Sequence, residues 1–379
     1  MDNQENVDLI KKINQKIHNN IVYNNKIHSY NIFIENDNKN IRIYYFDILR
    51  IVSCFSVILI HVSARYYYLF NLKSNNWKIA HCFNGISRFG VPIFFMISGA
   101  LFLSKDISFS KIFNKYIRRL LIKLIIWSFI YSIYKNDLSK KNIKFIIINF
   151  FKGNYHFWYL YVIIELYLIT PFLREIIKKD LLIIFIKLSF IFTFIIPNLN
   201  EFNSYYPSLL STILQIINIK FDFKYIKGYI FYFLFGYYLN NNKLSIFKII
   251  FIYICGIIGF VFTTLIFYKF SIKKNTKYLK YFRGLNLHIL LYSTSIFTFF
   301  KLNLNNYKIN ILFKRLSQYT FGIYLIHPLI LHKIRRIAGD FSSIKLIFRI
   351  PFISINVFII SLIICFLIKL IPIIGNYLI

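Results

Sequence analysis

The sequence predicts an all-α integral membrane protein with about ten transmembrane helices. Of its 379 residues, 57% are hydrophobic and 20% are aromatic, which is more apolar surface than a soluble domain of this length can bury. Apolar runs of about 20 residues, the length that spans a bilayer core as a helix, recur along the chain. We therefore expect a multi-pass protein of the cell membrane that is in contact with membrane lipids.

The formal net charge of +33 raises a nucleic-acid partner as an alternative. The Lys and Arg residues, however, are scattered through short loops between apolar runs and form no single stripe or patch, so we expect no nucleic acid as a partner. A basic surface also suits contact with anionic lipid headgroups. The four cysteines lie far apart without a CxxC or a His/Cys cluster, which predicts neither a metal site nor a redox motif.

Residues 1–40 are rich in Asn, Lys and Ile and have no clear apolar face. We expect them to form a disordered or loosely helical cytoplasmic leader that precedes a membrane domain at 41–379. The first apolar run begins only near Tyr44, and no small-residue cleavage site follows it. A cleavable signal peptide is therefore not predicted.

Ten apolar runs are candidate spans, with edges good to a few residues. They cover residues 44–64, 79–104, 119–134, 156–173, 181–197, 225–241, 246–268, 285–300, 309–331 and 351–371. The stretch "KNIKFIIINFFKGN" within 135–155 is too short to span and is expected in the membrane interface. The basic leader and the loop "KDISFSKIFNKYIRR" at 105–119 favour a cytoplasmic N-terminus under the positive-inside rule.

The first span is almost wholly apolar but carries Asp47, Arg50 and His61, of which Arg50 and His61 lie in its interior. They are eleven positions apart, which in a helix places both on one face with a rise of about 16 Å. Such a face is costly against lipid and should line a protein-enclosed cavity. Arginine forks onto phosphate or carboxylate and histidine exchanges a proton near neutral pH, so the pair suggests group transfer from a phosphorylated donor. The alternative is that Arg50 extends to the headgroups and His61 forms an inter-helix hydrogen bond.

Five motifs, in consistent order over residues 42–331, resemble the integral-membrane acyltransferase-3 family. They are "RIVSCFSVILIH" (50–61), similar to its R-x10-H signature, "SRFGVPIFFMISGALFL" (87–103), "NKYIRRLLIK" (114–123), "YHFWYLYVIIELYLITPFLR" (155–174) and "LSQYTFGIYLIHPLIL" (316–331). In the third motif, Lys115 and Arg118 have the spacing of the family's RxxR pair. Lys115 departs from that pattern, because lysine cannot make the bidentate contact of an arginine.

The resemblance implies a ten-helix transferase that passes an acyl group, usually acetyl from cytoplasmic acetyl-CoA, to a hydroxyl of a glycan. The acceptor is expected to be a cell-surface polysaccharide or a lipid-linked sugar. The donor is a substrate, and no permanently bound cofactor is expected. The chain looks like the single-domain O-acetyltransferases of the family, which lack an appended hydrolase-like domain.

Within this resemblance His61 is the candidate catalytic base, because the acceptor hydroxyl must lose a proton as it attacks the thioester. His61 could instead accept the acyl group and relay it. Arg50 is expected to hold donor phosphates or to orient His61, although Asp47, three residues earlier, could simply form an ion pair with it. Lys115, Arg118 and Arg119 suit the phosphates of coenzyme A and are equally well explained as topology determinants.

Arg88, in the second span, is expected to point into the cavity as a substrate contact. The nearby Gly90 and Gly99 should let helices approach closely. His156 and Trp158 begin the fourth span, where an aromatic belt and sugar stacking are both consistent with the pattern.

Glu165 and His327 complete the predicted substrate site. Glu165 is an unusual intramembrane carboxylate that could pair with Arg50 or Arg88, or act on His61 through its opposite charge. His327 precedes Pro328, which frees a backbone carbonyl one turn earlier. His327 could therefore satisfy that kink or contact the substrate.

Two other functions fit a membrane protein with a polar cavity. A glycan exporter or flippase would show broken helices or a repeated half-structure, and the sequence shows no internal repeat. A ligand-sensing membrane domain would accompany a second, soluble catalytic domain, and the sequence contains none.

Overall fold

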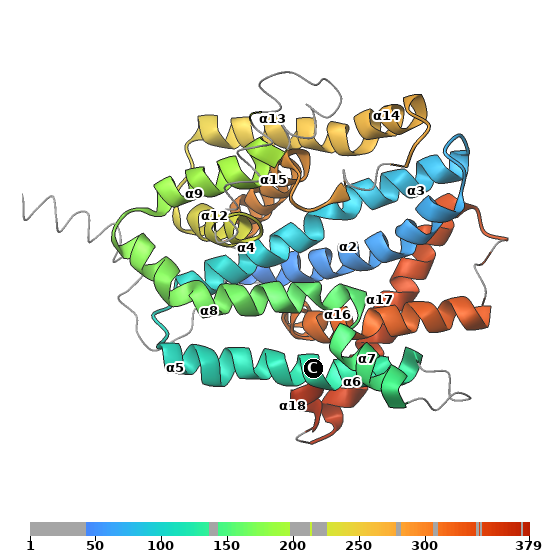
Figure 1. The fold of residues 1–379 in the computed structure, drawn as a ribbon. Coiled ribbons are helices and arrows are strands. Elements are labelled where there is room, and N and C mark those ends of the chain that lie inside the picture. Colours follow the sequence, from blue (N-terminus) through green and yellow to red (C-terminus); the bar gives the residue numbers. More distant parts are fainter. Residues whose placement is uncertain are drawn as a thin grey trace, which may run out of the picture. The chain divides into compact units, whose positions relative to one another are not determined.

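The computed structural model describes residues 43–135, 143–197, 213, 226–277, 282–305, 310–338, 341, 343–372 and 374–379. Every regular element within these residues is helical, so the predicted all-α fold class is confirmed (Figure 1). The predicted leader, residues 1–40, lies outside the described residues.

Each of the ten predicted spans overlaps a helix of the structure. The elements are α2 (Tyr44–Leu69), α3 (Asn75–Ile86), η1 (Ser87–Phe89), α4 (Gly90–Leu103), α5 (Phe109–Lys111), η2 (Ile112–Ile117), α6 (Arg118–Lys135), α7 (Ile143–Lys152), η3 (Tyr155–Phe157), α8 (Trp158–Lys178), α9 (Leu182–Phe190), η4 (Ile191–Ile195), α12 (Ile230–Asn241), α13 (Ile246–Val261), η5 (Phe262–Ile266), α14 (Phe267–Lys273), α15 (Leu287–Leu304), α16 (Ile311–Ala338), α17 (Leu346–Leu370) and α18 (Ile374–Leu378).

Two predicted boundaries differ from the structure for local reasons. The third helix begins at Phe109 instead of residue 119, because the Ser108 side chain accepts from the Lys111 N–H and caps a helix that continues through the π-turn η2 into α6. The second span is two helices, α3 and α4, joined by the 3₁₀ turn η1 that contains Arg88.

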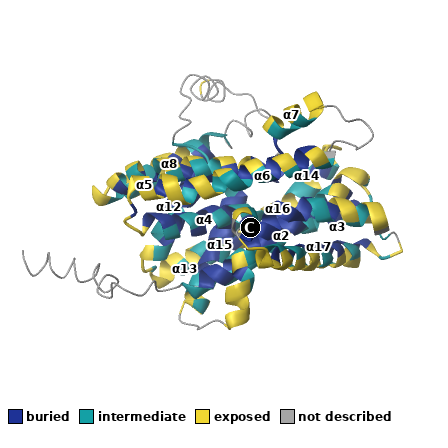
Figure 2. Cartoon of the chain, turned by 90° about the horizontal axis from the view of Figure 1, so that it is seen from below, coloured by how far each residue is buried: buried dark blue, intermediate teal, exposed yellow. Residues whose placement is uncertain are grey.

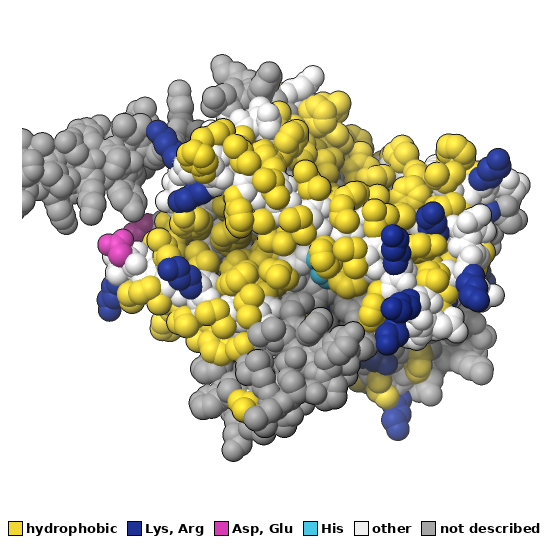
Figure 3. Space-filling model, turned by 90° about the horizontal axis from the view of Figure 1, so that it is seen from above, with side chains coloured by type: hydrophobic (Ala, Val, Ile, Leu, Met, Phe, Trp, Pro, Cys, Tyr) yellow, Lys and Arg dark blue, Asp and Glu magenta, His cyan; other side chains and the backbone are white. Residues whose placement is uncertain are grey.

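Four helical segments among the described residues are long and apolar enough to cross a membrane. They are Tyr44–Leu69, Asn75–Leu103, Ile246–Lys273 and Leu346–Leu370. Membrane crossing by the other predicted spans stays a prediction. Figure 3 shows a face, on the side of α13 and α14, where apolar side chains form a broad expanse with Lys and Arg toward its two ends, which is the pattern of a lipid-facing surface.

The interior is built around α2, which packs against α3, α4, α16 and α17. Figure 2 shows buried residues concentrated in α2 and α4, while outer helices such as α13 are largely exposed. Close approach of α4 to α12 requires glycine, because a Cβ at Gly99 would lie 1.7 Å from the Phe233 carbonyl oxygen. The predicted role of Gly90 and Gly99 in close packing is confirmed, since a Cβ at Gly90 would lie 2.0 Å from Ser56 Oγ of α2.

The short apolar stretch before the fourth span forms α7, which has no buried residue. Exposed apolar side chains on it include Ile143, Ile147 and Phe151. An exposed amphipathic helix of this length suits the membrane interface, and that location stays a prediction.

Candidate functional site

Three histidines from different elements meet inside the helical bundle. His61 of α2 stacks on His327 of α16, with ring centroids 5.2 Å apart and an interplanar angle of 30°. His156 of η3 lies edge-on to His327 at 5.7 Å. We call these three side chains the histidine cluster. Among the described residues, no group of three or more His, Cys, Asp or Glu side chains is arranged to hold a metal ion.

The tautomer of His327 follows from its backbone contact. Its Nδ1 lies 2.7 Å from the carbonyl oxygen of Tyr324, and a carbonyl can only accept, so Nδ1 carries the proton and donates it. Tyr324 is four residues before Pro328, which has no N–H to offer that carbonyl. His327 therefore supplies the hydrogen bond that Pro328 cannot donate to the Tyr324 carbonyl, which is one of the two roles predicted for it.

The second nitrogen of His327 is left as an acceptor. Nε2 is buried and has no hydrogen-bond partner among the described residues. A buried polar atom without a partner is uncommon and calls for an explanation such as a catalytic role. His327 thus combines a structural contact through Nδ1 with an available base nitrogen, Nε2, beside His61.

Three tyrosines surround the histidine cluster and hold its geometry. Tyr155 lies edge-on to His61 at 5.2 Å. The Tyr324 hydroxyl donates to the His156 carbonyl oxygen, and the Tyr131 hydroxyl donates to the Leu325 carbonyl oxygen at 2.8 Å. These bonds tie η3 and α6 to α16 beside the cluster.

A smaller cavity of about 320 Å³ lies on one side of the cluster. It is bordered by α2, α4, α8 and α16, and its polar lining includes Arg50, Lys105, Tyr167 and Thr320. Tyr324 also lines this cavity, and its ring centroid is 6.0 Å from that of His327. Tyr324 therefore links the smaller cavity to the histidine cluster.

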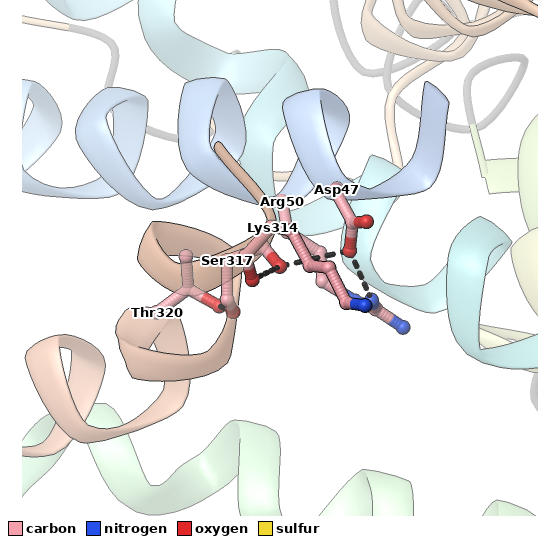
Figure 4. A network of polar contacts seen from close by, with 5 residues as sticks. All are labelled: Asp47, Arg50, Lys314, Ser317 and Thr320. Atoms are coloured by element: carbon pink, nitrogen blue, oxygen red, sulfur yellow. Dashed lines mark hydrogen bonds and ion pairs between the residues drawn. The ribbon is translucent and has the colours of Figure 1, made fainter. Parts of the chain in front are cut away.

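Arg50 forms an ion pair with Asp47, one of the alternatives that their spacing in the sequence predicted. Its Nη1 lies 3.3 Å from Asp47 Oδ1, and the same oxygen accepts from the Ser317 hydroxyl at 2.8 Å. Figure 4 shows Asp47 between Arg50 and Ser317. Asp47 is 1% exposed and Arg50 31% exposed, so a buried carboxylate compensates an arginine at the cavity wall.

A larger cavity of about 810 Å³ borders the other end of α2. Its lining includes Arg88 of η1, Trp158 of α8 and the segment 282–286, together with Ile60, the residue before His61. Val91 of α4 lines both cavities. The two cavities are therefore neighbours at the middle of the bundle.

Arg88 is held in the larger cavity by neutral groups. Its guanidinium donates to Asn84 Oδ1 through Nε at 3.0 Å and also through Nη2, and it lies 4.9 Å from the centre of the Phe282 ring. Asn84 in turn donates to the Ile60 carbonyl oxygen at 3.3 Å. Arg88 is thereby fixed to the turn of α2 that carries His61.

The predicted site residues are distributed over three places. His61, His156 and His327 form the cluster, Arg50 lines the smaller cavity, and Arg88 and Trp158 line the larger one. The expectation of one shared wall for Arg50 and His61 stays a prediction. Arg50 lines the smaller cavity, and His61 is not among the described residues that line either of these two cavities. Tyr324, which lines the smaller cavity, and His327 lie between Arg50 and His61.

Four of the predicted residues are exposed and line neither of the two cavities. Lys115, Arg118 and Arg119 lie on η2 and the start of α6, beside Tyr116, which lines the smaller cavity. Glu165 is exposed on α8. Glu165 does not form either ion pair considered for it, since the carboxylate that pairs with Arg50 is Asp47 and the Arg88 guanidinium bonds to Asn84.

Several contacts at the site escaped the sequence analysis. Asn84 lies four residues before Arg88, and Tyr324 three residues before His327, and both spacings place side chains on one helix face. These two residues could therefore have been found. Tyr155 and Arg335, whose Nη2 donates to the His61 carbonyl oxygen at 3.3 Å, carry no such local signal.

The fold and the site define a helical membrane protein with a buried histidine cluster between two cavities. The model of the acyltransferase-3 family, described as an acyltransferase domain, matches residues 43–370, and the chain belongs to this family. The family indicates a membrane acyltransferase and gives no support to the exporter or flippase. Neither the curated proteins nor the solved structures contain a match to this chain.

Proposed function

We propose that the protein is a multi-pass O-acyltransferase of the cell membrane, with all ten predicted spans crossing the bilayer. It moves an acyl group, acetyl in the first instance, from acyl-CoA to a hydroxyl of a cell-surface or lipid-linked glycan. The observation that carries this proposal is the position of the histidine cluster. Tyr324 connects it to the smaller cavity and Ile60 to the larger one, so a donor and an acceptor can approach it from different sides.

The smaller cavity is the proposed donor site. It is bordered by the N-terminal part of α2 and by Lys105, and the basic loop 105–119 predicts that this end faces the cytoplasm. The exposed cations Lys115, Arg118 and Arg119 would contact the phosphates of coenzyme A. The pantetheine arm would then enter past Tyr116 into a lining that is largely apolar.

The reaction needs one base and no redox partner. The hydroxyl oxygen of the glycan attacks the thioester carbonyl carbon, a C–O bond forms, and the C–S bond breaks to release the thiol of coenzyme A. His61 takes the hydroxyl proton and returns it to the leaving sulfur. His327, stacked on His61 and fixed through Nδ1, orients that imidazole.

The test compares His61→Ala and Arg50→Ala with the wild type by measuring ester-linked acetyl groups on the surface glycan. His332→Ala is a matched control, because His332 is exposed on α16 and bonds to Tyr134 outside the cluster. Loss of ester in the first two variants, with normal insertion and an intact control, is the expected result. Unchanged ester content would overturn the proposal, and loss of glycan export with intact acetylation would favour transport.

A further inference from the structure

The larger cavity has a cationic lining that the transfer reaction alone does not explain. Arg88, Lys227 and Arg283 line it, and none of the described lining residues is Asp or Glu. The side chains that hold Arg88 are an amide and a phenyl ring. The Arg283 side chain is exposed and forms no hydrogen bond or ion pair with the described residues.

A guanidinium inside a membrane protein is costly unless an opposite charge compensates it. Arg50 meets this requirement within the chain, through Asp47. Arg88 has no carboxylate partner among the described residues, although its position is fixed by two bonds to Asn84. An arginine that is fixed in place and faces a cavity without a counter-charge is suited to bind an anionic group of a ligand.

The same cavity carries aromatic faces for a sugar ring. Trp158 and Tyr229 both line it, with ring centroids 5.1 Å apart. Its wall is tied together, since Tyr232 donates to the Gly284 carbonyl oxygen at 2.7 Å and the Gly228 N–H donates to Thr193 Oγ1 at 2.9 Å. Gly284 leaves the space that Tyr229 occupies, because a Cβ there would lie 2.9 Å from the Tyr229 hydroxyl.

We infer that the acceptor bound in the larger cavity is an acidic glycan, a sugar that carries a phosphate or a carboxylate. Arg88 and Arg283 bind the acidic group, and the packed pair of Trp158 and Tyr229 contacts the sugar ring from one side. Asn84 joins Arg88 to the turn of α2 that bears His61, so the acidic group positions the sugar relative to the base. This inference rests on the proposed function, whose acceptor class it narrows.

The inference is tested by ligand binding without an acyl donor, so that its outcome does not depend on transfer. The full chain in lipid nanodiscs is titrated with glucose, glucose 1-phosphate, glucuronate and inorganic phosphate, and binding is followed by tryptophan fluorescence. We expect at least one acidic sugar to bind about ten-fold more tightly than glucose, the gain of one charged hydrogen bond. Whether glucose 1-phosphate or glucuronate binds more tightly shows whether the acidic group is a phosphate or a carboxylate.

Arg88→Gln should reduce this preference for the acidic sugar to about two-fold. Arg283→Gln is a second variant for the case that Arg88→Gln does not fold, and it should reduce the preference by a smaller factor. Arg65→Gln is the matched control, since Arg65 is exposed on the same end of α2 and does not line the cavity. Equal binding of glucose and both acidic sugars overturns the inference while leaving acyl transfer intact. Inorganic phosphate binding as tightly as glucose 1-phosphate, or equal losses in the control, overturns it as well.

Discussion

The two cavities differ most in how each compensates its arginine. At the smaller cavity, Arg50 pairs with the buried carboxylate of Asp47. At the larger cavity, Arg88 is held by the amide of Asn84. An arginine neutralised by its own chain can face a neutral ligand such as a pantetheine arm, whereas an uncompensated one requires an anion. Under the proposed function, this difference suits the two sides of the histidine cluster to different substrates.

The largest effect is expected at the cluster between the cavities. His61→Ala removes the proposed base and should lower the transfer rate about 100-fold or more. The measurement is release of coenzyme A thiol by the purified protein with a glycan acceptor. His332→Ala should keep the wild-type rate, and a comparable loss in both variants would mean that the effect is structural.

His327 and Pro328 give a smaller and more specific effect. Pro328→Ala restores an N–H that competes for the Tyr324 carbonyl, which frees the imidazole from its fixed tautomer. We expect the rate to fall about ten-fold while the thermal stability stays equal or rises, since proline destabilises a helix interior. An unchanged rate would show that the Tyr324 contact does not position His327.

Breaking the Arg50–Asp47 pair should lower the stability of the protein as well as its transfer activity. Arg50→Gln leaves the buried Asp47 carboxylate with fewer partners and should lower the free energy of unfolding by about 2 kcal/mol. The double variant Asp47→Asn/Arg50→Gln should recover part of that loss, as a double-mutant cycle in thermal unfolding would show. Additive losses would mean that the pair is not coupled.

The smallest effects belong to the exposed cations outside the smaller cavity. Lys115→Gln, Arg118→Gln and Arg119→Gln should each raise the KM for acyl-CoA about two- to three-fold, and the effect should weaken at high salt. Lys111→Gln, an exposed change one turn earlier, is the control. A salt-independent change in kcat would contradict a role in holding phosphates.

Local patterns in the sequence predicted the helices and several contacts that are made within one helix. Apolar runs predicted the helices because span length is set by the bilayer, and Pro328 predicted the contact of His327 because a proline removes a known backbone donor. The spacing of Asp47 and Arg50 predicted their ion pair. Each of these contacts is made within one or two turns of a single helix.

Contacts between helices distant in sequence were not predictable in this way. The stacking of His61 on His327 joins residues 266 positions apart, and the position of Glu165 depends on which face of α8 packs inward. One helix face cannot reveal which of two cavities it borders. The placement of Arg50 at the smaller cavity and of His61 in the histidine cluster therefore became visible only in three dimensions.

The central claim is that direct acyl transfer takes place at the histidine cluster, between a donor cavity and an acceptor cavity that we propose open to opposite sides of the membrane. Sealed inverted membrane vesicles, supplied with labelled acetyl-CoA outside and glycan acceptor inside, test it directly. We predict labelled ester on the enclosed glycan with the wild type and with His332→Ala, and none with His61→Ala. Labelling of the enclosed glycan by His61→Ala at the wild-type rate would contradict the account.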